Sequence, residues 1–346
     1  MPFRWGVLGV SYFGTKKMIP AIRAGRDMLV AAIASRGLER AEAAARELGI
    51  PKSYGSYEGL LADPTIDGVY IPLPNHLHVP WAIKAAEAGK HVLCEKPIAL
   101  HAAEARRLID ARDRCGVLIQ EAAMVRFHPR WLAARELVRK GKIGELSGFV
   151  GMFGYNLPSR DNVRYDPAKG GGALLDVGFY PVTTSRFCFD AEPFEAAATV
   201  DRDPGDGRGW PAGVSGPTGV DRLVAGVLRF PRGMATFTCG MQLVPFQRVD
   251  LLGSRGRIEI ETAWNPFPDR PSRLVMDTGP RLESPEREEI EFDTCNQYTI
   301  LAELFARAAR DGAPAPIPLE DSVRNMAALD ALFRSAESGR WEKVET

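Results

Sequence analysis

The sequence is poor in the residues that build disulfides and metal centres. It contains five cysteines and five histidines among 346 residues, and no two cysteines form a CxxC pair. This pattern predicts reduced, mostly buried thiols of the kind found in cytoplasmic proteins. The five histidines do not fall into the HExxH pattern of a zinc site. We therefore predict no metal site.

The sequence also lacks the features of several other protein classes. Lys plus Arg equals Asp plus Glu at 44 each, so there is no net charge to favour nucleic acid or a membrane surface. No window approaches the roughly 18 apolar residues that a membrane helix needs. The first residues enter an apolar strand without the pattern of a secretion signal. The absence of a GxSxG elbow and of a Walker pattern argues against hydrolases and kinases. We expect a cytoplasmic protein with a small-molecule partner.

What is present is a composition of 45% hydrophobic and 25% charged residues, enough for two domains with sizeable cores. The first 121 residues alternate short apolar runs with helical periodicity, which predicts βαβ units on a parallel sheet. Strands are expected at residues 4–9, 29–35, 68–71, 91–94 and 117–121, and helices at 15–24, 38–48, 57–62, 79–88 and 102–114. We therefore predict an α/β chain whose residues 1–121 form a doubly wound dinucleotide-binding domain of the Rossmann type.

From residue 122 the pattern changes to runs of strands between helices. Helices are expected at residues 129–139, 174–187, 297–310 and 319–338, and strands at 146–155, 196–202, 222–230, 234–241, 248–252 and 258–262. This order predicts a second, α+β domain at residues 122–346 with a mostly antiparallel or mixed sheet, whose last helix could pack back on the first domain. Residues 204–219 are rich in Gly and Pro and predict a loop, either a surface insertion or a substrate lid.

A glycine-rich turn follows the first predicted strand. In GVLGVSYFG (residues 6–14) the GxGxxG fingerprint falls on Gly9, Ser11 and Gly14, with serine in the second place. The first glycine allows a tight turn, the second position lets a pyrophosphate approach, and the third allows close helix packing. Serine is small and its hydroxyl can donate to a phosphate. We therefore expect a dinucleotide to bind this turn, including Tyr12 and Phe13.

The tip of the second predicted strand indicates which dinucleotide binds. An acid there would bind the free 2′-hydroxyl of NAD, but the strand ends in Ser35 and Arg36. A hydroxyl donor and a planar cation suit a 2′-phosphate, and Arg40 lies one helical turn further on. This predicts NADP, with NAD as the alternative if Arg36 is a solvated residue that only stacks over adenine.

The fourth predicted strand ends in an unusual tripeptide, Glu95-Lys96-Pro97. Proline cannot continue the hydrogen-bond ladder of a strand, and it moves the preceding residue away from helical geometry. The segment therefore predicts a strand end that holds Lys96 in a fixed pose. Further on, Asp176 and Tyr180 are spaced i, i+4 behind a triple glycine, so on a helix they would share one face.

Together these motifs resemble the Gfo/Idh/MocA oxidoreductases over essentially the whole chain. The resemblance rests on residues 6–14, on YIPLPNHLH (70–78), on HVLCEKPIAL (91–100) and on GGGALLDVGFYPV (170–182), in this order. It is strongest to the branch of NADP-dependent sugar dehydrogenases, glucose-fructose oxidoreductase and dimeric dihydrodiol dehydrogenases. That branch has a tyrosine, as here at Tyr180, where the wider family often has a histidine.

The resemblance implies a second domain with a large open sheet that serves as an interface in a homo-oligomer, a dimer or a tetramer. It also implies that Lys96 lies beside the nicotinamide and the substrate, with Asp176 and Tyr180 facing it. Other residues implied to contact the cofactor are Pro74, Asn75, His78 and Glu95. Those implied to contact the substrate are Arg126, Phe127, Asn162 and Arg164, although these stretches could also be ordinary loops.

These residues suit the oxidation of a carbinol, which needs a hydride acceptor, a base and positive charge near the developing alkoxide. A phenol has a pKa near 10. A lysine ammonium about 6 Å away would lower it by about two units, or roughly 3 kcal/mol at an effective dielectric of 20. Tyr180 is thus a candidate acid/base assisted by Lys96, with Asp176 orienting the substrate or Lys96. Without the resemblance, a solvated lysine and a packed tyrosine would explain the same residues.

We therefore predict an NADP-dependent oxidoreductase that acts on a carbinol or carbonyl carbon of a sugar or related polyol. The alternatives are a trans-dihydrodiol dehydrogenase or a ketosugar reductase with the same residues, and a non-catalytic regulator that senses the cofactor.

Overall fold

The computed structural model describes residues 1–204, 219–281 and 285–345. The chain divides into two compact units, each discontinuous in sequence. The first unit contains Met1–Met124 and Asn296–Val323, and the second contains Val125–Cys295 and Arg324–Thr346. The domain bounds that we predict, 1–121 and 122–346, stay a prediction. Most of the predicted Gly/Pro-rich loop, residues 205–218, lies outside the described residues.

The first unit is built on a six-stranded parallel sheet with the strand order β3-β2-β1-β4-β5-β6. Its strands are β1 (Phe3–Leu8), β2 (Met28–Ala34), β3 (Lys52–Tyr54), β4 (Gly68–Ile71), β5 (His91–Cys94) and β6 (Ile119–Glu121). This is the doubly wound order of dinucleotide-binding domains, which bind their ligand at the carboxyl ends of the strands where the order reverses, here between β1 and β4. The predicted fold class of this part of the chain is confirmed.

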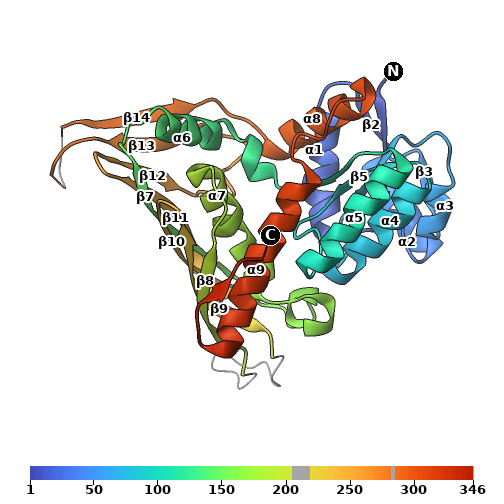
Figure 1. Cartoon of the computed structure of the whole chain (residues 1–346). Coiled ribbons are helices and arrows are strands. Elements are labelled where there is room, and N and C mark those ends of the chain that lie inside the picture. The colour runs from blue at the N-terminus through green and yellow to red at the C-terminus, as the bar shows by residue number, and fades with distance from the viewer. Residues whose placement is uncertain (205–218, 282–284, 346) are drawn as a thin grey trace. The chain divides into compact units, whose positions relative to one another are not determined.

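Helices complete the first unit (Figure 1). They are α1 (Ile19–Ala24), α2 (Leu38–Leu48), α3 (Tyr57–Leu61), α4 (His78–Glu87), α5 (Ala102–Cys115), α8 (Gln297–Asp311) and the start of α9 (Leu319–Ser338). A π-helical segment, Gly14–Met18, precedes α1. Although α8 is remote in sequence, it lies beside α1, and its Thr299 hydroxyl donates to the Ala21 carbonyl at 2.9 Å. Its Phe305 packs 5.5 Å from Trp5 of β1, and both side chains are fully buried.

The second unit contains a nine-stranded mixed sheet with the order β14-β13-β12-β11-β7-β10-β9-β8-β15. Its strands are β7 (Leu146–Asn156), β8 (Glu195–Arg202), β9 (Asp221–Phe230), β10 (Gly233–Gly240), β11 (Gln242–Gly253), β12 (Arg257–Glu261), β13 (Ser272–Asp277), β14 (Arg287–Phe292) and β15 (Glu342–Lys343). Only β7 and β10 pair in parallel; the other neighbours pair antiparallel. The predicted large, open and mostly antiparallel sheet is confirmed.

One face of this sheet carries the core of the second unit. The side chains of Phe149, Phe153 and Trp264 are almost fully buried. The helices of this unit are α6 (Pro129–Arg139), α7 (Phe179–Phe189) and the later part of α9. Nearly every residue of α7 is buried, as expected of a helix with no polar face. The helix predicted at residues 174–187 begins as a π-helical segment, Leu174–Gly178, so Asp176 and Tyr180 are not related by simple α-helical spacing.

All five cysteines are free thiols. Within the described ranges, no group of three or more His, Cys, Asp and Glu side chains is placed to hold a metal ion. Among the described helices, none combines the length and the apolarity that crossing a membrane requires.

Candidate active site

The turn after β1 has the geometry of a phosphate-binding loop. Gly9 adopts φ +123°, a conformation that other residues rarely take, and a Cβ there would lie 2.9 Å from Leu73 Cδ2. The Gly14 N–H donates to Ser11 Oγ at 2.9 Å, which leaves the Ser11 hydroxyl proton able to donate to a ligand. Tyr12 is exposed, whereas Phe13 packs edge-on against Tyr298 at 5.4 Å.

The carboxyl end of β2 gathers positive charge next to this turn. Ser35 is buried, and Arg36 and Arg40 are exposed. The Arg40 guanidinium donates to the Val10 carbonyl at 2.7 Å, so it lies beside the glycine turn. Burial raises the pKa of Tyr57, and the positive charges of Arg36 and Arg40 oppose that rise, which places both arginines near one phenol. The predicted residues at this strand end therefore come together.

The loop after β5 holds Lys96 on a backbone that several side chains fix. Tyr70, fully buried on β4, donates to Glu95 Oε1 at 2.6 Å. Glu121, buried at the end of β6, accepts from the Ile98 N–H at 2.7 Å. The Lys96–Pro97 peptide is cis. This loop therefore has the fixed backbone that the Glu-Lys-Pro tripeptide predicts, although the sequence alone did not indicate which side chains fix it.

The predicted cofactor residues after β4 lie in two environments. Pro74 precedes, and Asn75 begins, a short 3₁₀ helix, Asn75–Leu77, that follows β4. His78 is fully buried, and its ring nitrogens lie 2.7 Å from the carbonyl oxygens of Leu73 and Pro97. Burial lowers the pKa of His78 to about 4, while the two carbonyl contacts favour the charged ring. The His78 side chain therefore positions the loops that carry Leu73 and Pro97, and we do not expect it to contact a cofactor directly.

In the second unit, Asp176 is the centre of a polar cluster. Its Oδ2 lies 2.7 Å from Arg164 Nε and accepts a hydrogen bond from the Tyr155 hydroxyl at 2.5 Å. Burial and the Asp176 carboxylate raise the pKa of Tyr155, and Asp176 is also the main cause of the raised pKa of Arg164. Asn162 accepts from the Arg164 backbone N–H at 3.1 Å. The cluster is thus a paired acid and base that carries no net charge of its own.

Tyr180 lies next to this cluster. Its ring is 6% exposed and packs 5.3 Å from Phe153 and 6.3 Å from Trp264. Tyr180 also contributes electrostatically to the raised pKa of Arg164, so the phenol lies within electrostatic range of the guanidinium. The structure therefore brings Tyr180, Asp176 and Arg164 together within one unit.

The other predicted substrate residues lie on the short 3₁₀ helix Met124–Phe127. The Arg126 guanidinium stacks over the ring of Phe187 at 4.5 Å, and Phe127 is half-buried. Sequence reasoning missed Tyr155. The only signal for it was its place at the end of the predicted strand 146–155, two residues from Phe153, which put both rings on one face of that strand.

These residues fit a bound dinucleotide. Gly9 lets the backbone turn tightly, the Ser11 hydroxyl can donate a hydrogen bond, and Arg36 and Arg40 supply the positive charge that phosphate groups attract. All four lie at or next to the carboxyl ends of β1 and β2, where such ligands bind in this strand order.

The fold and these sites define a nicotinamide-dependent oxidoreductase, and comparisons with known proteins identify its family. Residues 3–123 match the family model described as "Oxidoreductase family, NAD-binding Rossmann fold", and residues 131–259 match the GFO/IDH/MocA C-terminal domain. The chain belongs to the Gfo/Idh/MocA family. The resemblance that we saw in its motifs is confirmed, and so is the prediction of an NAD(P)-dependent enzyme.

Several relatives match over nearly the whole chain. An uncharacterized oxidoreductase of Rhizobium meliloti is 46% identical over 343 residues, covering 99% of each chain. The D-xylose 1-dehydrogenase (NADP(+)) 2 of Haloferax volcanii is 38% identical, covering 97% of this chain and 98% of its own. The crystal structure of a 3-ketoreductase from Actinomadura kijaniata, in complex with NADP and TDP-benzene, superposes with a TM-score of 0.87 at 27% identity and covers 97% of this chain and 98% of its own.

Proposed function

We propose that this protein is an NADP-dependent oxidoreductase that interconverts a carbinol and a carbonyl carbon of a sugar or related polyol. Tyr180 is the acid/base in this proposal, and Lys96 assists it. The observation that carries the proposal is the buried phenol of Tyr180 beside a guanidinium that Asp176 holds. Relatives named for D-xylose oxidation and for 3-keto reduction, both with NADP in their names or titles, support the substrate class and the cofactor.

Each residue has a distinct part in the reaction. The nicotinamide, when bound, supplies the acceptor or donor of a hydride. Tyr180 takes the hydroxyl proton during oxidation and returns it during reduction. The ammonium group of Lys96 favours the phenolate form of Tyr180 and stabilises negative charge on the substrate oxygen. Asp176 keeps Arg164 and Tyr155 in place, where their remaining hydrogen-bonding capacity can orient substrate hydroxyls.

A trans-dihydrodiol dehydrogenase is a second candidate. A mouse relative named as a trans-1,2-dihydrobenzene-1,2-diol dehydrogenase, 33% identical over 288 residues, supports it. A trans-dihydrodiol dehydrogenase would use the same acid/base pair, as would a ketosugar reductase that runs in the opposite direction.

A two-step experiment tests the proposed function. NADPH and NADH are first titrated by fluorescence, and aldoses, ketosugars and trans-dihydrodiols are then screened through nicotinamide absorbance. Turnover of an aldose or ketosugar supports the first reading, and turnover of dihydrodiols alone supports the second. Tight dinucleotide binding without any turnover would contradict both and favour a regulator that senses the cofactor.

The choice of NADP over NAD gives a specific prediction. Replacing Arg36 with aspartate removes a cation and adds an anion where a 2′-phosphate is expected, so NADPH should bind at least about tenfold more weakly. NADH binding should hold or improve, because an acid at this place bonds a free 2′-hydroxyl. The measurement is the ratio of the two dissociation constants, obtained by fluorescence titration.

The matched control is Arg46→Asp. Arg46 lies on α2, is 73% exposed and pairs only loosely with Glu42, at 3.9 Å. The Arg46→Asp substitution makes the same change in charge, but away from the end of β2. The ratio of the NADPH and NADH dissociation constants should therefore equal that of the parent protein. An Arg36→Asp protein with the parental preference would overturn the assignment of NADP to this strand end.

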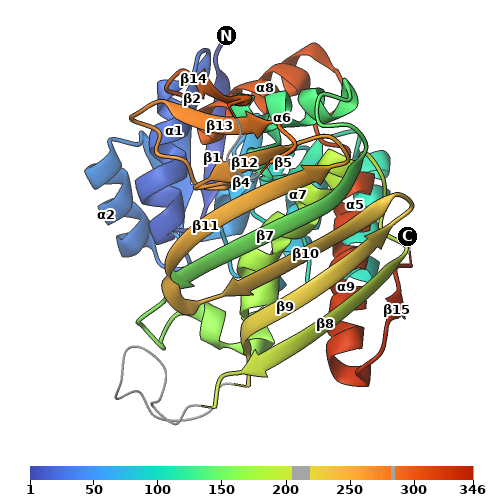
Figure 2. The ribbon, with the colours of Figure 1, turned by 90° about the vertical axis from the view of Figure 1, so that its left-hand side faces the viewer.

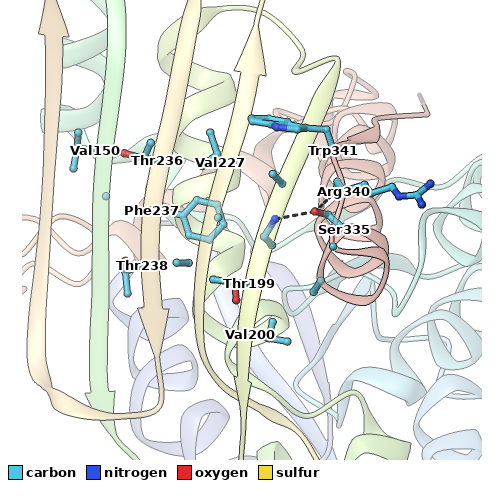
Figure 3. A pocket seen from close by; sticks show the side chains of 17 residues that line it. Val150, Thr199, Val200, Val227, Thr236, Phe237, Thr238, Ser335, Arg340 and Trp341 are labelled. Atoms are coloured by element: carbon cyan, nitrogen blue, oxygen red, sulfur yellow. Dashed lines mark hydrogen bonds between the residues drawn. The ribbon is translucent and has the colours of Figure 1, made fainter.

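We also propose that the protein forms a homo-oligomer, a dimer or a tetramer, through the open face of its second sheet. In Figure 2, strands β11, β7, β10, β9 and β8 lie side by side with no helix in front of them. Cross-strand pairing places Val150, Thr236, Val227 and Ala197 in one row on that face, and Figure 3 shows the first three on neighbouring strands. Val150 and Met234 are 43% and 51% exposed, so the face is partly apolar, and Asp250 of β11, which pairs opposite Val150, brings a charge to one side of this row.

This proposal predicts that Val150→Asp dissociates the oligomer. A carboxylate at the centre of an isologous interface faces its own copy across the twofold axis, and like charges there lose their solvation without gaining a partner. Sedimentation velocity should show the parent as a dimer or larger species and the variant as a smaller one. Leu132→Asp is the control, because Leu132 lies on α6 with 48% of its surface exposed, and this variant should keep the oligomer mass of the parent protein. A monomeric parent protein, or a variant of parental mass, would rule out this face.

A further inference from the structure

A buried carboxylate that the reaction does not use holds the segment leading to Asp176 and Tyr180. Asp221, the first residue of β9, is 4% exposed. Its Oδ2 accepts from the Leu174 N–H at 2.6 Å, and it also interacts with the backbone of Ala173. Leu174 begins the π-helical segment that contains Asp176 and continues into α7 with Tyr180. Asp221 therefore satisfies N–H groups that a helix start leaves without intrahelical partners.

The triple glycine passes between Asp221 and the backbone of Arg164. Gly172 has φ +115°, and a Cβ on it would overlap Asp221 Oδ1. A Cβ on Gly171 would overlap the Arg164 carbonyl oxygen, which itself accepts from the Gly172 N–H at 2.9 Å. The close approach explains why these positions have no side chain. It also means that Asp221 fixes the turn that ties Arg164 to the helix bearing Asp176.

We propose that Asp221 is a positioning residue for the reaction, which holds the turn at Gly172 and Leu174 so that Asp176, Arg164 and Tyr180 keep their geometry. This inference rests on the proposed function. Asp221 itself is too buried to meet a substrate, so it acts only through the main chain. An error of about 1 Å in the placement of an acid/base group can cost about a hundredfold in rate, which is why such an anchor matters.

The surroundings of Asp221 give the anchor a pH dependence. Burial raises its pKa to about 6, and Arg202 on β8 opposes this rise. Cys239 on β10 also interacts with Asp221 and with Asp176, and burial holds the pKa of its thiol well above the usual value, so the thiol is neutral. As the pH falls through about 6, Asp221 gains a proton and accepts less strongly from Leu174. The acid limb of the rate profile should therefore contain this ionisation.

The test compares Asp221→Ala and Asp221→Asn with Asp201→Ala. Asparagine can still accept from the Leu174 N–H but does not titrate. Asp201 is a carboxylate on the neighbouring strand β8 that pairs with Arg222 at 2.8 Å and is 51% exposed, so it is a matched control. The readouts are kcat and KM for a substrate found in the screen above, the pH profile of kcat, NADPH affinity, and amide hydrogen exchange of peptides spanning residues 170–180.

We expect Asp221→Ala to lower kcat by about tenfold to a hundredfold with NADPH affinity unchanged, and to raise amide exchange only in residues 172–178. Asp221→Asn should recover most of kcat at neutral pH and lack the acid limb near pH 6. Asp201→Ala should match the parent protein in every readout.

Three outcomes would overturn the inference. The first is parental kcat in Asp221→Ala despite locally raised exchange, and the second is raised exchange throughout the chain, which would make Asp221 a general stability residue. The third is parental exchange in residues 172–178. If the parent protein turns over no substrate, the proposed function fails and the positioning role fails with it, whereas raised local exchange would then show only that Asp221 anchors the turn.

Discussion

Lys96→Met and Tyr180→Phe should each lower turnover at least about a hundredfold while NADPH still binds. Methionine keeps the length of the side chain without its charge, and phenylalanine keeps the ring of a residue that packs against Phe153 and Trp264 without its hydroxyl. A hundredfold loss corresponds to about 2.7 kcal/mol of transition-state stabilisation, within the range of one general acid/base group. The measurement is steady-state kinetics together with a fluorescence titration of NADPH.

The controls remove a lysine and a phenolic hydroxyl elsewhere. Lys84 lies on α4, is half exposed and pairs with Glu58 at 2.9 Å, so Lys84→Met should leave turnover unchanged. Tyr155→Phe removes a phenol that donates to Asp176. It should slow the reaction less than Tyr180→Phe, because Arg164 still holds the carboxylate. Near-normal turnover in either Lys96→Met or Tyr180→Phe would falsify the assigned mechanism.

His128 is expected to make the protein lose stability in acid. Its ring is 2% exposed, and Nδ1 accepts from the Arg130 N–H at 3.1 Å at the start of α6. Burial, and then the charge of Arg130, lower the pKa of His128 to about 4 from its usual 6.5. The unfolded chain therefore binds a proton more readily than the folded protein between pH 4 and pH 6.5. The contribution of neutral His128 to the free energy of unfolding is complete above pH 6.5 and disappears as the pH falls toward 4. It amounts to roughly 3 kcal/mol.

His128→Asn isolates this effect. Asparagine caps a helix start through its side-chain oxygen but does not titrate, so the variant should keep α6 and lose the acid dependence that His128 adds. Urea unfolding from neutral pH to about pH 4 should show the parent losing roughly 3 kcal/mol more than the variant. Asp221 acts in the opposite direction, because its raised pKa favours the folded state in acid. Both proteins contain Asp221, so its effect cancels in the difference between their free energies of unfolding. Parallel pH curves would contradict the prediction.

The sequence predicted most of the fold where local signals are strong. The bounds of α2, α6 and α9 agree with the predicted helices, because their apolar residues recur at helical spacing between a glycine or proline start and a clear end. The missed strands lacked such signals. β3 and β15 are very short, and β13 (Ser272–Asp277) has an apolar run of only three residues, 274–276. β14 (Arg287–Phe292) is an edge strand whose charged residues show no apolar alternation.

The candidate site was predictable only where its residues lie in continuous motifs. The turn at Gly9 and Ser11 and the loop at Lys96 each follow a strand end and could be identified from a few neighbouring letters. Tyr155 and Asp221 could not, because their partners lie 21 and 47 residues away in sequence. Pairing of this kind depends on strand register in the folded sheet, which no local pattern specifies.

The contact between Trp5 and Phe305 has a consequence for how the chain is made. The helix that covers the tryptophan of β1 is translated only after nearly 300 further residues have been made. The nascent parallel sheet must therefore wait for its last covering helix, with apolar surface exposed in the meantime. A fragment cut at the end of β6 would retain that exposed surface permanently, so recombinant versions of the first unit need the segment Asn296–Val323 joined to them.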